Sequence, residues 1–340
     1  MKVLVTGTDG YIGVMLGPVL QERGHQVTGL DTGYYRDGWL YDGAKPLAHT
    51  IRKDIRHITE KDLEGFDAVA HLAELSNDPL GQLNPDITYK INHQGSVELA
   101  RKAKAAGVRR FVYTSSCSVY GLGSDEYRTE LSETAPQTAY AKCKVMVERD
   151  VALLAAPGFS PTYLRNATAY GPSPRMRFDI VVNNLSALAW TTREIKMTSD
   201  GTPWRPLVHL LDICQAVACC LEAPKEAVHN EIFNVGNTED NYRVREIAEI
   251  VAQTFPGCRL SFGKVDPDNR SYRVSFEKIK DRLPGFKTKY RAGDGAAQLK
   301  EVFEKIAFND DTFKFRAFTR LKQLEHLIGT GKLDNDFFWK

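Results

Sequence analysis

The chain has 340 residues, a formal net charge of +2, 42% hydrophobic residues and 26% charged residues, which is the composition of an ordinary globular protein. The near-zero charge gives no reason to expect nucleic acid or an anionic membrane as a partner, and no apolar run reaches the roughly 20 residues that span a bilayer. The six cysteines form no Cys-x-x-Cys pair and show no Cys/His spacing typical of a metal site. We therefore expect reduced thiols, no metal and a cytoplasmic location.

The first predicted elements are a strand and a glycine turn. Residues 2–6 form a short apolar run rich in β-branched side chains, typical of a buried parallel strand. Gly7, Gly10 and Gly13 follow at a spacing that permits a tight turn, a close approach of backbone N–H groups to a diphosphate, and close packing of the next helix. The N-terminus of that helix would point its free N–H groups at the phosphates. This segment predicts a dinucleotide site.

A second predicted strand, residues 26–30, ends at Asp31. A carboxylate at this place accepts hydrogen bonds from the ribose hydroxyls of the adenosine and repels a 2′-phosphate, so we expect NAD rather than NADP. The alternative is an ordinary strand–helix turn followed by a solvated acid. We favour the dinucleotide site because the glycines lie between a strand and a helix and the acid follows near the expected distance.

The first half of the chain continues as alternating strands and helices. Strands at residues 68–72, 110–115 and 161–165, with helices at residues 84–106 and 139–155, predict an α/β fold with a Rossmann-type doubly wound parallel sheet. Ligands of such sheets bind at the carboxyl ends of the strands. We therefore expect the polar side chains that follow these strands to meet along one edge.

The later segments alternate less regularly and predict a smaller, discontinuous C-terminal substrate lobe. The predicted units are an NAD-binding Rossmann domain at residues 1–165, which also receives segments around 207–235, a substrate-binding lobe mainly at residues 166–310, and a C-terminal helical tail at residues 311–340. Within the tail, a charged amphipathic helix is expected at about residues 313–328. We expect the tail to pack on the body as a strap, with an oligomer contact as the alternative.

The segment from Tyr140 to Lys144 predicts acid–base chemistry. Positions i and i+4 share one helix face, and a nearby ammonium lowers the pKa of a phenol, which is about 10 in the free side chain. Lys144 can also hold the ribose of a nicotinamide. Ser116 ends the strand at residues 110–115, where its hydroxyl could bind the substrate oxygen that loses or gains a proton. The alternatives are a surface tyrosine, a solvated lysine and a capping serine, but the three features occur together and in order.

These motifs resemble those of the extended short-chain dehydrogenases/reductases, in the NAD-dependent nucleotide-sugar epimerase/dehydratase group. The resemblance runs from residue 1 to about residue 310 and includes Tyr170-Gly-Pro172 and the motif at residues 200–212. It implies Ser116, Tyr140 and Lys144 as catalytic residues. The further cofactor-binding residues that it implies are Tyr11, Ile12, Asp54, Ile55, Leu72, Ala73 and Asn92, and the substrate-binding residues are Cys117, Ser118, Asn184, Arg205 and Arg270.

The resemblance also implies the substrate class, a nucleotide-diphosphate sugar, and a homodimer formed through the helices at residues 84–106 and 139–155. Related dehydratases carry Asp-Glu, and decarboxylases a Glu, in the two positions before Val119, where this chain has Cys117 and Ser118. We therefore predict an epimerase, acting at C4 through a transient 4-keto sugar with Tyr140 as acid and base. Two alternatives stay open: a 4-ketoreductase or dehydrogenase with net cofactor turnover, and a non-catalytic protein that senses a dinucleotide.

Overall fold

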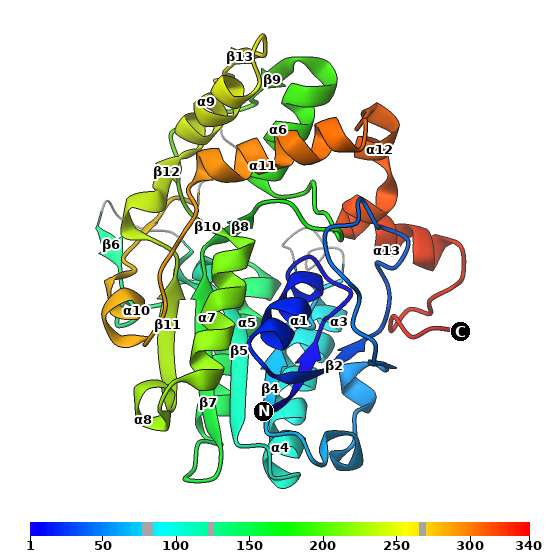
Figure 1. The fold of residues 1–340 in the computed structure, drawn as a ribbon, viewed down its shortest axis with the longest axis vertical. Coiled ribbons are helices and arrows are strands. Elements are labelled where there is room, and N and C mark those ends of the chain that lie inside the picture. The colour runs from blue at the N-terminus through cyan, green and yellow to red at the C-terminus, as the bar shows by residue number, and fades with distance from the viewer. Residues whose placement is uncertain (77–83, 122–125, 265–269) are drawn as a thin grey trace.

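The computed structural model describes residues 1–76, 84–121, 126–264 and 270–340, and a seven-stranded parallel sheet forms its centre (Figure 1). In spatial order the strands are β11 (Glu231–Val235), β7 (Ser160–Asn166), β5 (Arg110–Ser116), β4 (Ala68–His71), β1 (Lys2–Thr6), β2 (Gln26–Asp31) and β3 (Thr50–Arg52). The chain winds outward from β1 through β2 to β3 and then returns to β4, on the other side of β1. The predicted doubly wound fold is confirmed, and the change of direction between β1 and β4 creates a crevice for a ligand.

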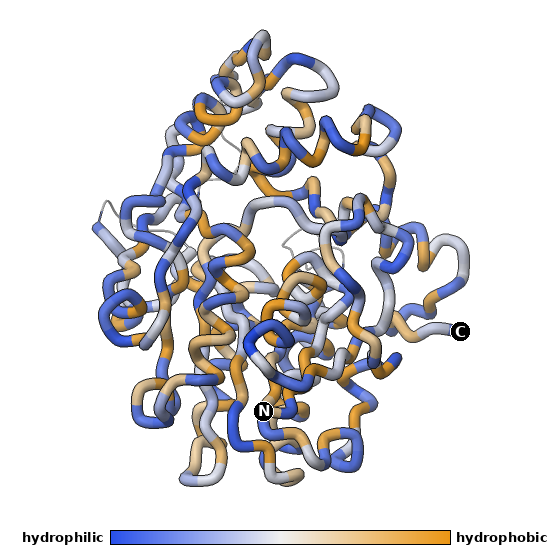
Figure 2. The backbone as a smooth tube through the Cα atoms, viewed as in Figure 1, coloured by the Kyte–Doolittle hydropathy of each residue, from blue (hydrophilic) through white to orange (hydrophobic). Residues whose placement is uncertain are grey.

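Helices cover both faces of the sheet, and each face has its own hydrophobic core. Helices α1 (Gly13–Glu22) and α7 (Leu210–Glu222) pack against each other on one face. Helices α4 (Ser96–Ala105) and α5 (Ala139–Ala152) pack together on the other face. The hydrophobic residues gather along the strands and these helices, as Figure 2 shows. This burial on both sides explains why the strands read as apolar runs rather than as alternating patterns.

The helix predicted at residues 84–106 is confirmed, with an unexpected middle section. Asn84 caps α3 (Pro85–Thr88), a π-helical stretch follows at Tyr89–Gly95, and α4 continues to Ala105. Helix α5 begins after Thr138, whose hydroxyl accepts a hydrogen bond from the N–H of Ala141 at 3.2 Å. The homodimer through these helices stays a prediction.

A second lobe lies above the carboxyl ends of the strands (Figure 1). Its helices α6 (Val181–Thr192), α9 (Val244–Thr254) and α11 (Ala292–Lys305) pack against one another around a third hydrophobic core. The remaining strands are β6 (Tyr127–Arg128), β8 (Thr168–Tyr170), β9 (Glu194–Lys196), β10 (Trp204–His209), β12 (Asn241–Arg243), β13 (Arg259–Ser261) and β14 (Arg273–Val274), and two short helices are α8 (Lys225–Val228) and α10 (Glu277–Arg282). The predicted domain boundaries stay predictions.

The tail differs from the single helix that the sequence predicted at about residues 313–328. The structure instead has α12 (Asp310–Lys314), a 3-10 turn at Arg316–Phe318 and α13 (Arg320–Gly329), so that prediction was wrong. The break buries Phe318 in the core of the second lobe, while Leu324 and Leu327 pack in the core beside α4 and α5. The tail is therefore a strap that joins the second lobe to the sheet. No helix in the described part of the chain is both long and apolar enough to cross a membrane.

Candidate active site

A cavity of about 910 Å³ follows the carboxyl ends of β1, β2, β4 and β5, beneath the second lobe. Most of the side chains predicted from the sequence meet there. Those that line the cavity are Gly7, Gly10, Tyr11, Ile12, Gly13, Asp31, Asp54, Ile55, Leu72, Ala73, Ser116, Ser118, Tyr140, Lys144, Arg205 and Arg270. They come from segments up to 263 residues apart (270 − 7), so only the parallel sheet and the lobe above it bring them together.

The glycine turn between β1 and α1 is too tight for side chains. Gly7 has φ +78°, and a Cβ there would lie 2.9 Å from the backbone nitrogen of Ala73. A Cβ on Gly13 would lie only 2.0 Å from the carbonyl oxygen of Gly7. The turn thus brings bare backbone and the N-terminus of α1 to the wall of the cavity. Such an arrangement can bind an anion, because the N–H groups and the helix dipole both favour negative charge.

Asp31 ends β2 and is buried, with 9% of its surface exposed. Its carboxylate accepts hydrogen bonds from the N–H of Asp9 at 2.9 Å and from the N–H of Gly33 at 2.7 Å. Burial, together with the charge of Asp9, raises the pKa of Asp31 to about 6, although both hydrogen bonds oppose the shift. The carboxylate is therefore held in place at the cavity wall and changes charge near pH 6.

We expect the affinity for NAD to rise as the pH increases from 5 to about 7 and then to level off. The ionised Asp31 is the better acceptor for ribose hydroxyls, and a pKa raised to about 6 means that this form disappears as the pH falls through 6. The preference for NAD over NADP should also weaken at pH 5, because a neutral acid does not repel a 2′-phosphate. Equilibrium dialysis with each cofactor across this range measures both effects. Asp31→Asn is the control and should flatten both profiles; an unchanged pH dependence in that variant would contradict the assignment.

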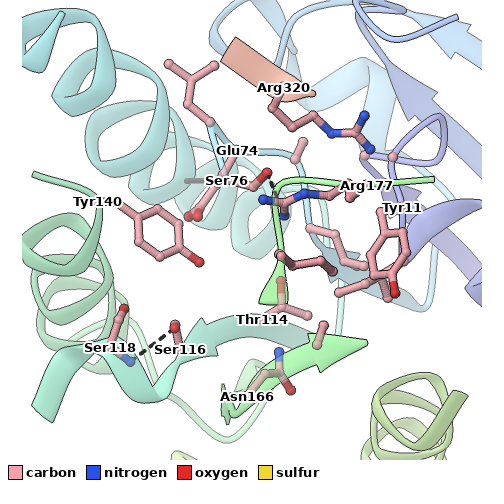
Figure 3. A pocket seen from close by; sticks show the side chains of 18 of the residues that line it. Tyr11, Glu74, Ser76, Thr114, Ser116, Ser118, Tyr140, Asn166, Arg177 and Arg320 are labelled. Atoms are coloured by element: carbon pink, nitrogen blue, oxygen red, sulfur yellow. Dashed lines mark hydrogen bonds between the residues drawn. The ribbon is translucent and has the colours of Figure 1, made fainter. Parts of the chain in front are cut away.

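Tyr140, Lys144 and Ser116 lie at the other end of the cavity. Tyr140 and Ser116 extend into it from α5 and from the end of β5, as Figure 3 shows. The ammonium nitrogen of Lys144 lies 5.3 Å from the centre of the Tyr140 ring, and the carbonyl oxygen of Thr114 accepts a hydrogen bond from it. The Ser116 hydroxyl oxygen accepts a hydrogen bond from the N–H of Ser118 at 3.2 Å. The three groups can therefore act on one substrate oxygen.

The sequence reasoning missed Glu74, a buried acid that lines the same cavity. Its carboxylate forms an ion pair with Lys144 and accepts a hydrogen bond from the Tyr113 hydroxyl at 2.6 Å. Burial has the largest single effect and lowers the pKa of Lys144, but the charges of Glu74 and Tyr140 and the hydrogen bond to Glu74 together outweigh it, so the net shift is upward. The sequence did contain one indication of this residue: an acid lies three residues after the end of β4, and such sheets bind ligands at the carboxyl ends of their strands.

Three predicted residues are not among those that line the cavity. Cys117 is buried, and its thiol donates a hydrogen bond to the carbonyl oxygen of Arg165. Asn92 bonds through its side-chain amide to both backbone groups of Leu75, and so holds the segment after β4. The Asn184 amide donates to the carbonyl oxygen of Phe178 at 2.9 Å. The binding roles expected for these three residues stay predictions.

Two arginines in the cavity wall were also missed. Arg177 lies in the segment before α6, and Arg320 is the first residue of α13 in the tail. Both guanidinium groups lie on the side of the cavity away from Ser116 and Ser118 (Figure 3). Nothing in the sequence indicated that the tail lies near the cavity. A single arginine outside the family motifs cannot be distinguished, from sequence, from an ordinary surface arginine.

Comparison with known proteins identifies the family. The model of the NAD dependent epimerase/dehydratase family matches residues 3–236. The chain belongs to this family. It is an NAD-dependent enzyme of the extended short-chain dehydrogenase/reductase type, which excludes the non-catalytic sensor considered from the sequence.

The relatives within the NAD dependent epimerase/dehydratase family catalyse more than one reaction. The UDP-glucose 4-epimerase of Corynebacterium glutamicum is 30% identical over 265 residues, 74% of this chain and 79% of the relative. The UDP-N-acetyl-alpha-D-glucosaminuronate decarboxylase of Bacillus cytotoxicus is 26% identical over 83% of this chain and 88% of its own. The solved structure of MoeE5 in complex with UDP-glucuronic acid and NAD has a TM-score of 0.77 and 26% identity, covering 90% of this chain and 99% of the other. Membership of the family therefore does not determine which of these reactions the chain catalyses.

Proposed function

We propose that the protein is a nucleotide-sugar 4-epimerase. The observation that carries this proposal is the position of Ser116, Tyr140 and Lys144 at one end of a cavity whose other end holds the glycine turn and Asp31. This arrangement fits NAD: bare backbone for the diphosphate, a carboxylate for the adenosine ribose, and a proton-transfer group beside the nicotinamide. The similarity to a UDP-glucose 4-epimerase supports the same reaction.

In this proposal Tyr140 moves a proton at the 4-hydroxyl oxygen of the sugar. The ammonium of Lys144 stabilises negative charge on the phenolic oxygen, so the phenolate can accept the hydroxyl proton. Ser116 donates a hydrogen bond to the same sugar oxygen and keeps it in place for the transfer. When bound beside these residues, NAD would supply the acceptor for the hydride of carbon 4 and the donor for its return. After the keto sugar turns over, Tyr140 gives the proton back, so the cycle is redox-neutral.

The cavity offers no free acid for dehydration among the residues that the structure describes. The four described carboxylates in its wall are engaged: Asp31 by backbone N–H groups, Asp54 by Arg56, Glu74 by Lys144 and Asp179 by Arg177. Burial raises the pKa of the Cys117 thiol well above its usual range, and the thiol does not line the cavity. Elimination of water needs an acid beside the leaving hydroxyl, so these contacts favour epimerisation.

Mass spectrometry combined with chromatography of sugar isomers tests the reaction. We expect purified protein, NAD and UDP-glucose or UDP-glucuronic acid to give an isomer of unchanged mass without NADH accumulation. A product lighter by one water, or by carbon dioxide, would overturn the epimerase proposal. A change of two hydrogens matched by cofactor turnover would instead support the ketoreductase or dehydrogenase alternative. Tyr140→Phe protein is the control, because an isomer that it also forms does not come from the proposed chemistry.

A further inference from the structure

Arg320 carries a buried positive charge from the tail into the cavity. It is 2% exposed, and its guanidinium lies 4.1 Å from the centre of the Tyr35 ring. It donates long hydrogen bonds, 3.4 Å to the carbonyl oxygen of Ala317 and 3.3 Å to that of Arg175. Among the described residues, no carboxylate forms an ion pair with this guanidinium. A charge buried in this way is costly unless an anion joins it.

Arg177 adds a second cation at the same place. Its Nε pairs with Asp179 at 2.8 Å, and it donates a long hydrogen bond of 3.4 Å to the Ser76 hydroxyl. The charge of Arg175, whose carbonyl oxygen accepts a hydrogen bond from Arg320, also acts on the Arg320 guanidinium, and Asp179 pairs directly with Arg177 alone of these three arginines. Burial, and then the charge of Arg177, lowers the pKa of Arg320 to about 10. The cluster therefore has a surplus of positive charge and attracts an anion.

The position of the cluster indicates which anion it meets. Arg177 and Arg320 both act electrostatically on Tyr11, which precedes α1, and on Tyr35, which follows the strand that ends at Asp31. Arg177 is also coupled to Tyr140. In Figure 3 the Arg177 guanidinium lies between Tyr11 and Tyr140, and the Arg320 guanidinium lies on the Tyr11 side of the cavity. The cluster thus occupies the stretch between the adenosine ribose end and the nicotinamide end, where an extended dinucleotide carries its diphosphate.

We propose that Arg320 and Arg177 bind the diphosphate of NAD from the side opposite the glycine turn, so that the C-terminal tail forms one wall of the cofactor site. The N-terminus of α1 contributes backbone N–H groups on one side, and the two guanidinium groups contribute charge-assisted hydrogen bonds on the other. The tail is held in place for this role. The Tyr34 hydroxyl donates to the carbonyl oxygen of Phe337, and the Trp339 indole donates to that of Thr32 at 2.8 Å.

Arg320→Met tests the proposal by binding and stability rather than by turnover. We expect NAD to bind about 10- to 100-fold more weakly, the loss typical of a hydrogen bond to a charged group. Equilibrium dialysis against NAD, with bound cofactor measured by chromatography, gives the affinity. The affinity for adenosine, which has no diphosphate, should be unchanged when it is measured by competition. The melting temperature without NAD should stay the same or rise, because a costly buried charge is replaced by an apolar side chain of similar length.

Arg316→Met is the matched control in the same tail. Arg316 pairs with Asp37 and does not line the cavity, so its replacement should leave NAD affinity unchanged. Arg320→Lys should keep part of the affinity because it keeps the charge. Equal losses in Arg316→Met and Arg320→Met, or a lower melting temperature with normal NAD binding, would show that Arg320 only packs the tail. Normal NAD binding with weaker binding of a UDP-sugar would assign the anion to the substrate and overturn the proposal.

Discussion

Tyr140→Phe should reduce turnover by about 10²- to 10⁴-fold while NAD binding stays nearly unchanged, because only the oxygen that moves the proton is removed. The ring itself remains beside Lys144, so the cavity keeps its shape. Isomer formation measured by chromatography and NAD affinity measured by equilibrium dialysis give the two quantities. Tyr127→Phe is the control, because Tyr127 is exposed and outside the cavity wall. Near-normal turnover in the Tyr140→Phe protein would eliminate the proposed acid–base role.

Lys144→Met should lose turnover and also lower the free energy of unfolding by about 3 kcal/mol. The loss arises because Glu74 would keep a buried carboxylate without its cation; the two side chains are 3% and 4% exposed. Removing the acid as well, in Glu74→Gln/Lys144→Met, should recover most of the stability but none of the activity, since Tyr140 still lacks the ammonium. Urea unfolding of the two single variants and the double variant measures the coupling between these residues.

The destabilisation by Lys144→Met should be smaller at pH 5 than at pH 8. Burial already raises the pKa of Glu74, and loss of Lys144 removes the charge that opposes this shift. An acid whose pKa is raised in the folded state costs stability as the pH increases, and protonation at low pH relieves that cost. Lys142→Met, at an exposed position on the same helix, is the control and should change neither stability nor activity. Equal destabilisation in both variants would contradict the proposed pairing.

The local patterns allowed the fold to be predicted because each one depends on near neighbours in the chain. The apolar runs that became β1, β4 and β5 are buried on both faces, and such strands show their burial directly in their composition. The glycine turn could also be predicted, since a Cβ at Gly13 would collide with the carbonyl oxygen of Gly7, six residues earlier in the chain. Tyr140 and Lys144 share a helix face by spacing alone.

The tail shows where such reasoning stops. Its amphipathic spacing predicted one helix, but the chain breaks at residues 315–319 so that Phe318 enters one core and Leu324 another. The spacing of apolar residues shows that a segment has an apolar face, but it does not show that two different hydrophobic cores will bury that face. The same break directs Arg320 into the cavity. The wrong prediction of a single helix and the failure to predict Arg320 as a cavity residue therefore have the same cause.

By itself, the sequence determined the doubly wound sheet, the glycine turn, Asp31 and the Ser116–Tyr140–Lys144 set, because turn sterics and residue spacing act locally. Only the tertiary structure decided that Glu74 forms an ion pair with Lys144 and that Arg177 and Arg320 share one wall of the cavity. Electrostatic interactions depend on distance in space and on burial, and both are set when segments far apart in the chain pack together.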